Sequence, residues 1–281
     1  MRWLVTGAAG MLGTDLVAVL RGRGHDVVGI DRDSVDITDP EACVGLADHF
    51  DVVVNCAAFT AVDAAESDEP AAFAVNAVGA ANLARAAQRG GARMVQISTD
   101  YVFDGTAVAP YAETAPIGPR SAYGRTKAAG EWAVRAECPD HLVVRTAWLY
   151  GANGPCFPKT IARVARERGG AEVITDQIGQ PTWTVDLADL VHRLVLAKAP
   201  AGTYHGTSTG AVSWHGFARA VVEAAGFDGD IVRPTTSDAF ARPAPRPGYS
   251  VLGHKSIERI GVAPIGAWGD RWAAAAPAVL A

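Results

Sequence analysis

Short apolar runs alternate along the first half of the chain with longer stretches in which apolar residues recur at helical spacing. The runs are rich in β-branched residues and show little alternation of apolar and polar positions, which is typical of strands buried on both faces. Strands separated by helices indicate repeated βαβ units. The pattern therefore predicts an α/β fold, a Rossmann-type doubly wound parallel sheet, with strands at Trp3–Val5, Val27–Ile30, Val52–Val54, Met94–Ile97 and Leu142–Val144.

The intervening stretches carry helix start and stop signals. A capping side chain followed by proline opens a helix at Asp39-Pro40, and Ser67–Pro70 opens a long helix to about Gln88 that Gly90-Gly91 terminates. Two further helices are expected, one from a glycine-rich turn to about Arg23 and one capped by Ser121 that runs to about Glu137.

After about Gly151 the pattern loosens. Helices are predicted at Pro158–Arg168 and Val185–Leu196, a strand at Glu172–Thr175 and an ordered loop at Pro234–Pro247. We interpret residues 1–150 as a dinucleotide-binding Rossmann domain. Residues 151–281 are expected to form mainly a smaller α/β substrate-binding lobe, with some segments returning to the first domain.

Composition narrows the class of protein. The 281 residues are 49% hydrophobic, and 30 acidic against 25 basic side chains give a net charge of -5, which argues against a nucleic-acid partner. No apolar run approaches the roughly 18 residues of a membrane span and no signal-peptide pattern is present, so a cytoplasmic protein without a membrane partner is expected. The cysteines lack paired ligand spacing, so neither a metal site nor a disulfide framework is expected: Cys43, Cys56, Cys138, Cys156.

The glycine-rich turn has the context of a dinucleotide fingerprint. Gly7, Gly10 and Gly13 follow a predicted strand and open a helix with Met11 and Leu12. Gly7 permits the tight turn, Gly10 lets backbone amides approach a pyrophosphate, and Gly13 allows close packing of helix on sheet. The helix N-terminus then supplies unpaired N–H groups and a positive dipole end for the anion.

Other residues extend this expected cofactor site. Asp31 ends the second strand, where an acid contacts the adenosine ribose and favours NADH, whereas the neighbouring Arg32 could pair with the 2′-phosphate of NADPH. The choice between NADPH and NADH stays open. Residues expected to flank the adenine or to let the cofactor lie against the strand ends are Asp36, Ile37, Ala57 and Ala58.

Tyr123 and Lys127 form the candidate catalytic pair. Their i, i+4 spacing on a predicted helix puts both side chains on one face. A lysine cation favours the phenolate and moves the tyrosine pKa from about 10 toward neutrality, where proton transfer is most effective. A dry pocket and the positive charge of a bound nicotinamide must contribute to such a shift. Thr99, at the end of the fourth strand, offers a hydroxyl to a carbonyl or its alkoxide.

At these residues the chain resembles the extended short-chain dehydrogenase/reductase superfamily, and within it the dTDP-4-dehydrorhamnose reductase family. The resemblance runs from Met1 to about Trp272. The blocks that carry it are Phe59–Glu66, Ser98–Gly105, Arg145–Tyr150, Asp176–Thr182 and Arg246–Ser250.

The resemblance implies reduction of the C4 ketone of a dTDP-linked deoxyhexulose, most simply dTDP-4-dehydro-L-rhamnose, by NADPH or NADH. It implies that Tyr123 protonates the C4 oxygen, that Lys127 holds the nicotinamide ribose and tunes Tyr123, and that Thr99 positions the carbonyl. Arg246 is implied for the diphosphate, and Trp148 for an apolar face against the sugar ring. The other residues implied near the sugar are Thr60, which also borders the cofactor, Asp100 and Tyr101.

Several positions depart from the family pattern. Cys156 stands where an asparagine is common, and Tyr249 replaces a smaller polar residue. Some members form magnesium-bridged homodimers through glutamates. A homodimer is therefore an open expectation, but Asp15 and Val185 stand at two of those positions and no metal is assigned.

Three alternative functions stay open at this point. One is a reductase for another nucleotide-linked ketodeoxysugar. The second is a non-catalytic reductase-like subunit, which the intact Tyr123 and Lys127 disfavour. The third is an epimerase or dehydratase of the same superfamily, and a dehydratase is disfavoured because Asp100 is the only acid beside Thr99.

Overall fold

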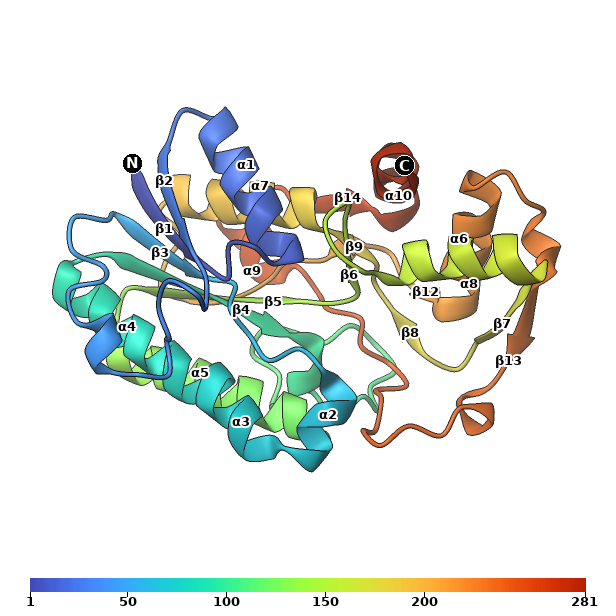
Figure 1. Cartoon of the computed structure of the whole chain (residues 1–281), viewed down its shortest axis with the longest axis horizontal. Helices are drawn as coiled ribbons and strands as arrows, with labels where there is room; N and C mark the ends of the chain where they lie inside the picture. Colours follow the sequence, from blue (N-terminus) through green and yellow to red (C-terminus); the bar gives the residue numbers. More distant parts are fainter.

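A six-stranded parallel sheet forms the centre of the molecule, which a computed structural model describes over all 281 residues (Figure 1). The strand order is β10-β5-β4-β3-β1-β2. The strands are β1 (Arg2–Thr6), β2 (Asp26–Ile30), β3 (Val52–Asn55), β4 (Arg93–Thr99), β5 (His141–Thr146) and β10 (Gly202–His205). The five strands predicted from the first half are therefore confirmed, and the doubly wound α/β fold with them.

Helices cover both faces of this sheet, as the unbroken apolar runs require. Alternate residues of one strand point to opposite faces, so Val52 and Val54 pack in one core and Val53 in the other. The first core is closed by α1 (Met11–Gly22) and α7 (Thr184–Leu196), and the second by α4 (Ala80–Gly90) and α5 (Ala122–Glu137). Figure 1 shows these two layers above and below the sheet.

One predicted helix is wrong and another is more elaborate than expected. The helix predicted from Asp39-Pro40 is a single 3-10 turn, η1 (Glu41–Cys43), because Val44 is extended and Gly45 takes a left-handed φ of 70°. The long helix begins and ends as predicted, with Asp68 capping it and Gly91 at φ 70° terminating it. It nevertheless comprises α3 (Glu69–Phe73), a π-helical stretch η2 (Ala74–Gly79) and α4, and an unpredicted α2 (Val62–Ser67) precedes it.

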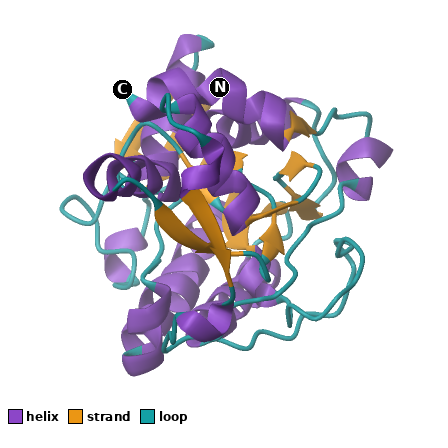
Figure 2. Ribbon diagram, turned by 90° about the vertical axis from the view of Figure 1, so that its right-hand side faces the viewer, coloured by secondary structure: helices purple, strands orange, loops and turns teal.

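A smaller lobe follows β5 and packs around its own core of aromatic and aliphatic side chains. Figure 2 looks onto this lobe, whose strands are short. The predicted helix and strand near residues 158–175 are confirmed. The stretch predicted as a loop instead starts within β13 and contains the 3-10 turn η5. The remaining elements are η3 (Asp100–Val102), β6 (Leu149–Tyr150), α6 (Phe157–Arg168), β7 (Ala171–Ile174), β8 (Ile178–Gly179), β9 (Thr182–Trp183), β11 (Ser208–Thr209), β12 (Val212–Ser213), α8 (Trp214–Ala224), η4 (Gly229–Ile231), β13 (Val232–Thr235), η5 (Ser237–Ala239), α9 (Lys255–Arg259), β14 (Ile265–Ala267) and α10 (Trp268–Leu280).

The chain does not separate cleanly at residue 150. After β9 it returns to the sheet twice, as α7, which packs on α1, and as β10, which forms an edge strand beside β5. The functional division into a cofactor domain and a substrate lobe stays a prediction. None of the helices is long and apolar enough to cross a bilayer.

Candidate active site

A cavity of about 930 Å³ opens at the carboxyl ends of the central strands, where ligands bind in doubly wound folds. Its size suits a dinucleotide together with part of a second ligand. It brings together nearly all of the site residues predicted from the sequence. Those that line it are Gly7, Gly10, Met11, Leu12, Gly13, Asp31, Arg32, Asp36, Ile37, Ala57, Ala58, Thr60, Thr99, Asp100, Tyr101, Tyr123, Lys127 and Trp148.

The glycine turn has no room for side chains. Gly7 has a φ of 66°, and a Cβ there would lie 2.6 Å from the backbone nitrogen of Ala57. A Cβ on Gly13 would lie 2.1 Å from the carbonyl oxygen of Gly7. Gly10 caps α1 without a side-chain acceptor, so the first amides of the helix remain available for an anion. The turn therefore has the form that a pyrophosphate requires.

Asp31 and Arg32 lie side by side just after β2, and only the Asp31 side chain has hydrogen-bond partners within the chain. The Asp31 carboxylate accepts hydrogen bonds from the backbone N–H groups of Ala9 and Arg32, so it braces the glycine turn. The Arg32 guanidinium has no partner within the chain. Farther along, Asp36 accepts from the backbone and hydroxyl of Thr38 at 2.9 and 2.8 Å, which holds the loop beside the cavity and lowers the Asp36 pKa.

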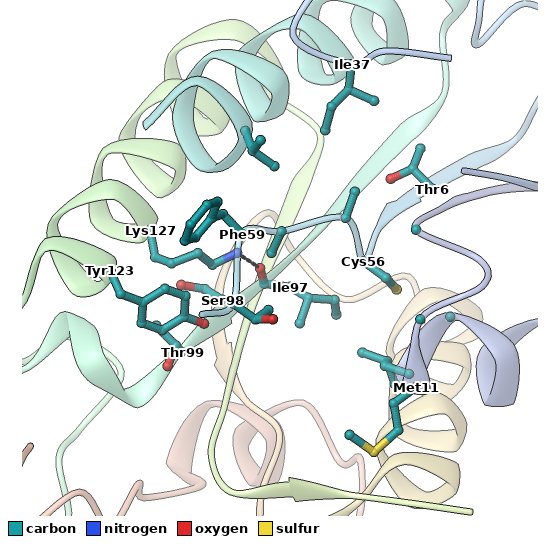
Figure 3. A pocket seen from close by; sticks show the side chains of 18 of the residues that line it. Thr6, Met11, Ile37, Cys56, Phe59, Ile97, Ser98, Thr99, Tyr123 and Lys127 are labelled. Carbon is teal, nitrogen blue, oxygen red and sulfur yellow. Dashed lines mark hydrogen bonds between the residues drawn. The ribbon is translucent and has the colours of Figure 1, made fainter. Parts of the chain in front are cut away.

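The candidate catalytic pair projects from the start of α5 toward the end of β4 (Figure 3). Ser121 caps this helix by accepting from the backbone of Gly124, as the sequence predicts. Lys127 is 4% exposed, and its Nζ donates to the carbonyl oxygen of Ile97 at 2.7 Å. Burial lowers the pKa of Lys127 to about 8, against the opposing charge of Glu131.

The pKa of Tyr123 moves opposite to the expected direction. Burial raises it to about 12, and the neighbouring Thr99 side chain only partly offsets this shift. The Lys127 ammonium is engaged by the Ile97 carbonyl and does not lower the Tyr123 pKa in this geometry. Tyr123 is consequently a neutral phenol at physiological pH, the form that can donate a proton.

Thr99 and Asp100 are linked beside this phenol. The Thr99 hydroxyl donates to one carboxylate oxygen of Asp100 at 2.9 Å, and the other oxygen is buried without a hydrogen-bond partner at ordinary distance. Asp100 is 2% exposed, and burial raises its pKa to about 6 although Ser250 and Thr99 oppose the shift. Tyr101 presents its ring edge-on to Tyr123, with centroids 5.6 Å apart.

A buried ion pair behind the catalytic helix was missed in the sequence. Glu131 is fully buried and binds Arg145 through two hydrogen bonds of 2.8 Å. It also accepts from Ser98 at 2.7 Å and from Arg135 at 2.9 Å. The available signal was an acid one helical turn after Lys127 on the buried face of the helix. This network connects α5 to the ends of β4 and β5. It therefore fixes the backbone positions from which Tyr123 and Lys127 project.

Arg246 lies outside the main cavity. Its guanidinium pairs in bidentate fashion with Asp63 of α2 at 2.6 and 2.8 Å, which lowers the Asp63 pKa, and it lines a small adjoining pocket with Tyr101. Its assignment to a diphosphate stays a prediction. Of the two departures from the family pattern, Cys156 is the N-cap residue of α6 and Tyr249 forms a bridge to Ile178, and neither lines the main cavity.

The Trp148 indole has neither face free. One face stacks on Trp214 with ring centroids 3.5 Å apart and planes inclined by 9°. A Cβ on Gly179 would lie 2.4 Å from Cε2 and 2.6 and 2.7 Å from Cζ2 and Nε1, distances that place Gly179 over the opposite face. Both faces are covered in this arrangement, so the indole meets the cavity with its edge, and the assignment of Trp148 to the sugar stays a prediction.

Comparison with known proteins places the chain in a family. The model of the family described as the RmlD substrate binding domain matches residues 1–279. A dTDP-4-dehydrorhamnose reductase of Streptomyces griseus is 49% identical over 95% of this chain and 90% of its own. A probable dTDP-4,6-dihydroxy-2-methyloxan-3-one 4-ketoreductase of Streptomyces antibioticus is 48% identical over 100% of this chain and 96% of its own.

Solved structures agree. A dTDP-4-dehydrorhamnose reductase of Clostridium acetobutylicum superposes with a TM-score of 0.94 at 41% identity, covering 98% of both chains. That of Bacillus anthracis, solved in complex with NADP, superposes with a TM-score of 0.93 at 35% identity over 98% of both chains. Fold, motif order and overall similarity agree along the whole chain, which belongs to the dTDP-4-dehydrorhamnose reductase family.

Proposed function

We propose that this protein reduces the C4 keto group of a dTDP-linked 4-dehydro-6-deoxyhexose with NADPH or NADH, most simply dTDP-4-dehydro-L-rhamnose to dTDP-L-rhamnose. The observation that carries the proposal is the convergence of Thr99, Tyr123 and Lys127 at one end of a cavity whose other end is a glycine turn. The names of the relatives support the substrate class.

The residues present fit a nicotinamide dinucleotide. The glycine turn and the uncapped start of α1 would hold the pyrophosphate, Asp31 or Arg32 would contact the adenosine ribose, and Ala57 and Ala58 leave space at the strand ends. The reduced nicotinamide would supply hydride to C4. Lys127 would contact the nicotinamide ribose after exchanging its hydrogen bond with the Ile97 carbonyl.

The chain's own residues would manage the proton. The raised pKa keeps Tyr123 neutral, and Tyr123 would donate its phenolic proton to the C4 oxygen because an alkoxide is a stronger base than phenolate. The Thr99 hydroxyl, which donates to Asp100 at 2.9 Å in this structure, would exchange that bond to donate to the C4 oxygen. The buried network of Glu131 with Arg145 and Ser98 holds α5 against the ends of β4 and β5, so the proton donor is pre-positioned.

The names of the relatives point to two alternative sugar substrates. A dTDP-4-keto-6-deoxy-D-glucose reductase of Streptomyces niveus is 48% identical to this chain, close to the 49% of the dehydrorhamnose reductase from Streptomyces griseus. Identity therefore does not discriminate between the C3,C5-epimerised sugar and its precursor. The second candidate is a reductase that accepts the unepimerised D-sugar.

The experiment follows oxidation of NADPH and of NADH with dTDP-4-keto-6-deoxy-D-glucose, with and without a 3,5-epimerase. Oxidation only in the presence of the epimerase establishes the dehydrorhamnose reductase. Oxidation without it establishes the second candidate. Lack of oxidation with both nucleotides and both sugars would refute the proposed reduction.

A further inference from the structure

Trp148 has a backbone conformation that bulky residues rarely adopt. Its φ is 48°, in the left-handed region, and such strain persists only where the surrounding structure imposes it. Directly after it, β6 pairs with β9, and the backbone N–H of Thr182 donates to the Trp148 carbonyl oxygen at 3.2 Å. The strained residue borders the cavity, so the position of its side chain has a direct effect on what the cavity accepts.

The two groups that hold the indole come from one structural unit. Gly179 ends β8 and pairs with Val212 of β12, and Trp214 follows β12 as the first residue of α8. Ser213 caps this helix by accepting from the backbone of Gly216 at 3.0 Å, and Phe157 packs against Trp214 with centroids 4.5 Å apart. The β8–β12 ribbon therefore fixes the spacing between the two supports, and the indole fills the gap.

The same ribbon is connected to the residues around the candidate catalytic site. Backbone hydrogen bonds of 2.9 Å join Ile178 of β8 to Gly248 and Ser250. The Ser250 side chain in turn opposes the rise in the pKa of Asp100 that burial causes. A displacement of β8 would thus move Trp148 and the surroundings of Asp100 together. Trp214 therefore supports the candidate site through its contact with Trp148, although it does not itself line the cavity.

We propose that Trp214 and Gly179 are positioning residues that clamp the Trp148 indole, so that its edge forms a fixed wall against the sugar of a bound sugar nucleotide. A fixed wall limits the positions of the sugar, which aligns its C4 with Tyr123 and Thr99 at little entropic cost on binding. The inference rests on the proposed function, since it assumes that a sugar nucleotide occupies this end of the cavity. It assigns specificity to residues outside the glycine turn and the Tyr-Lys pair.

The test compares Trp214→Ala, Trp214→Phe and Gly179→Ala with the wild-type enzyme. Trp214→Ala uncovers one face of Trp148. Gly179→Ala leaves both indoles in the chain but puts a Cβ where the ring lies, 2.4 Å from Cε2. Both changes should raise KM for the sugar nucleotide by about tenfold or more, with a smaller fall in kcat. The Kd of NADPH should stay within about twofold, because the glycine turn is not altered, and Trp214→Phe should restore most of the affinity.

A spectroscopic signature reports the clamp directly. Two stacked indoles couple their electronic transitions, and the pair gives an exciton couplet in far-ultraviolet circular dichroism when their transition dipoles are rotated relative to one another about the stacking axis. Trp148→Ala and Trp214→Ala should each abolish the couplet. Trp132→Ala is the matched control, because Trp132 is 61% exposed on α5 and contacts neither indole. It should change neither the couplet nor KM.

Binding of dTDP-glucose, measured by calorimetry, separates this inference from the proposed function. If the wild-type enzyme turns over none of the sugars but both clamp variants lose affinity for dTDP-glucose, the clamp stands and the proposed reaction fails. An unchanged KM and Kd in folded Trp214→Ala or Gly179→Ala would overturn the clamp. If Trp214→Ala does not fold, Gly179→Ala and Trp214→Phe decide the question.

Discussion

At the scale of single residues, Tyr123 is the group expected to protonate the C4 oxygen. Tyr123 is kept neutral by burial and lies beside Thr99, which suits it to donate rather than to accept a proton. Tyr123→Phe should lower kcat by about a hundredfold or more, the usual contribution of a general acid. The Kd of NADPH should barely change, since the ring remains. Stopped-flow and fluorescence titration measure both quantities, and a variant that keeps near-normal turnover would remove Tyr123 from the role of acid.

The lowered pKa of Lys127 leads us to expect that the activity depends on pH. Burial lowers its pKa to about 8, so the ammonium is present below that pH and lost above it. If the charged form contacts the cofactor, kcat/KM should fall by roughly tenfold per pH unit above about pH 8, because kcat/KM reports groups of the free enzyme. A profile that remains level to pH 9.5 or so would contradict this assignment. In Lys127→Met the residual activity should show no such alkaline limb.

At the scale of elements, the sequence predicted the strands better than the connections between them. Runs such as Val52–Val54 need burial on both faces, and only a covered parallel sheet provides it. The helix predicted at Asp39 has a good capping pattern, yet Gly45 and the turns after it end the element after one turn. Local signals define where a helix can start, whereas the packing of the following residues decides whether it continues.

The residues of the candidate site also differ in whether the sequence alone could predict them. Tyr123, Lys127 and the glycine turn were predictable because their spacing within one element carries the chemistry. Glu131 with Arg145, and Trp214 with Gly179, were not, because each pair joins two different elements and neither member forms a local motif. The packing of Trp148 was not predictable either, since its covered faces depend on two segments of the second half.

The packing of α5 against the π-helical stretch η2 gives an element-scale prediction. A Cβ on Gly130 would lie 2.1 Å from the carbonyl oxygen of Asn76, whose side chain also donates to Thr126 at 3.0 Å. Gly130→Ala should therefore lower the free energy of unfolding by about 1–3 kcal/mol despite its better helix propensity. Gly269→Ala in α10 is the control, since nothing lies near its Cβ and the change should be neutral or stabilising.

Chemical denaturation of both variants measures these effects. Equal stability of Gly130→Ala and wild type would mean that the two helices can separate without cost, contrary to the close approach described above. Because α5 carries Tyr123 and Lys127, we also expect Gly130→Ala to lower kcat more than Gly269→Ala does.

For the whole molecule, buried histidines link stability to pH. His205 is fully buried between the sheet and the segment around Gly253, and burial together with the nearby Arg145 charge lowers its pKa to about 3. His254 adds to this lowering and Glu131 opposes it. The folded form stays neutral while the unfolded chain takes up a proton near pH 6.5. The stability contribution of His205 is thus complete above about pH 6.5 and is lost as the pH falls toward 3.

Between pH 7.5 and pH 5 this linkage amounts to about 2 kcal/mol for His205. His205→Asn keeps a donor for the Gly253 carbonyl but does not titrate. The difference in unfolding free energy between wild type and this variant should shift by that amount toward the variant at the lower pH, as urea titrations at the two pH values would measure. A difference independent of pH would show that His205 is not held neutral in the fold.

The position of β10 at the edge of the sheet limits where the chain can be truncated. A fragment that stops near residue 150 would lack this strand, so the N–H and C=O groups on the outer side of β5 would have no partners. It would also lack α7, which leaves the face of the sheet beside α1 open to solvent. We expect such a fragment to self-associate when expressed alone and to regain a monodisperse state only when residues 151–281 are supplied in trans. The first 150 residues would thus be an incomplete folding unit, and exchanging them between related proteins would require carrying β10 along.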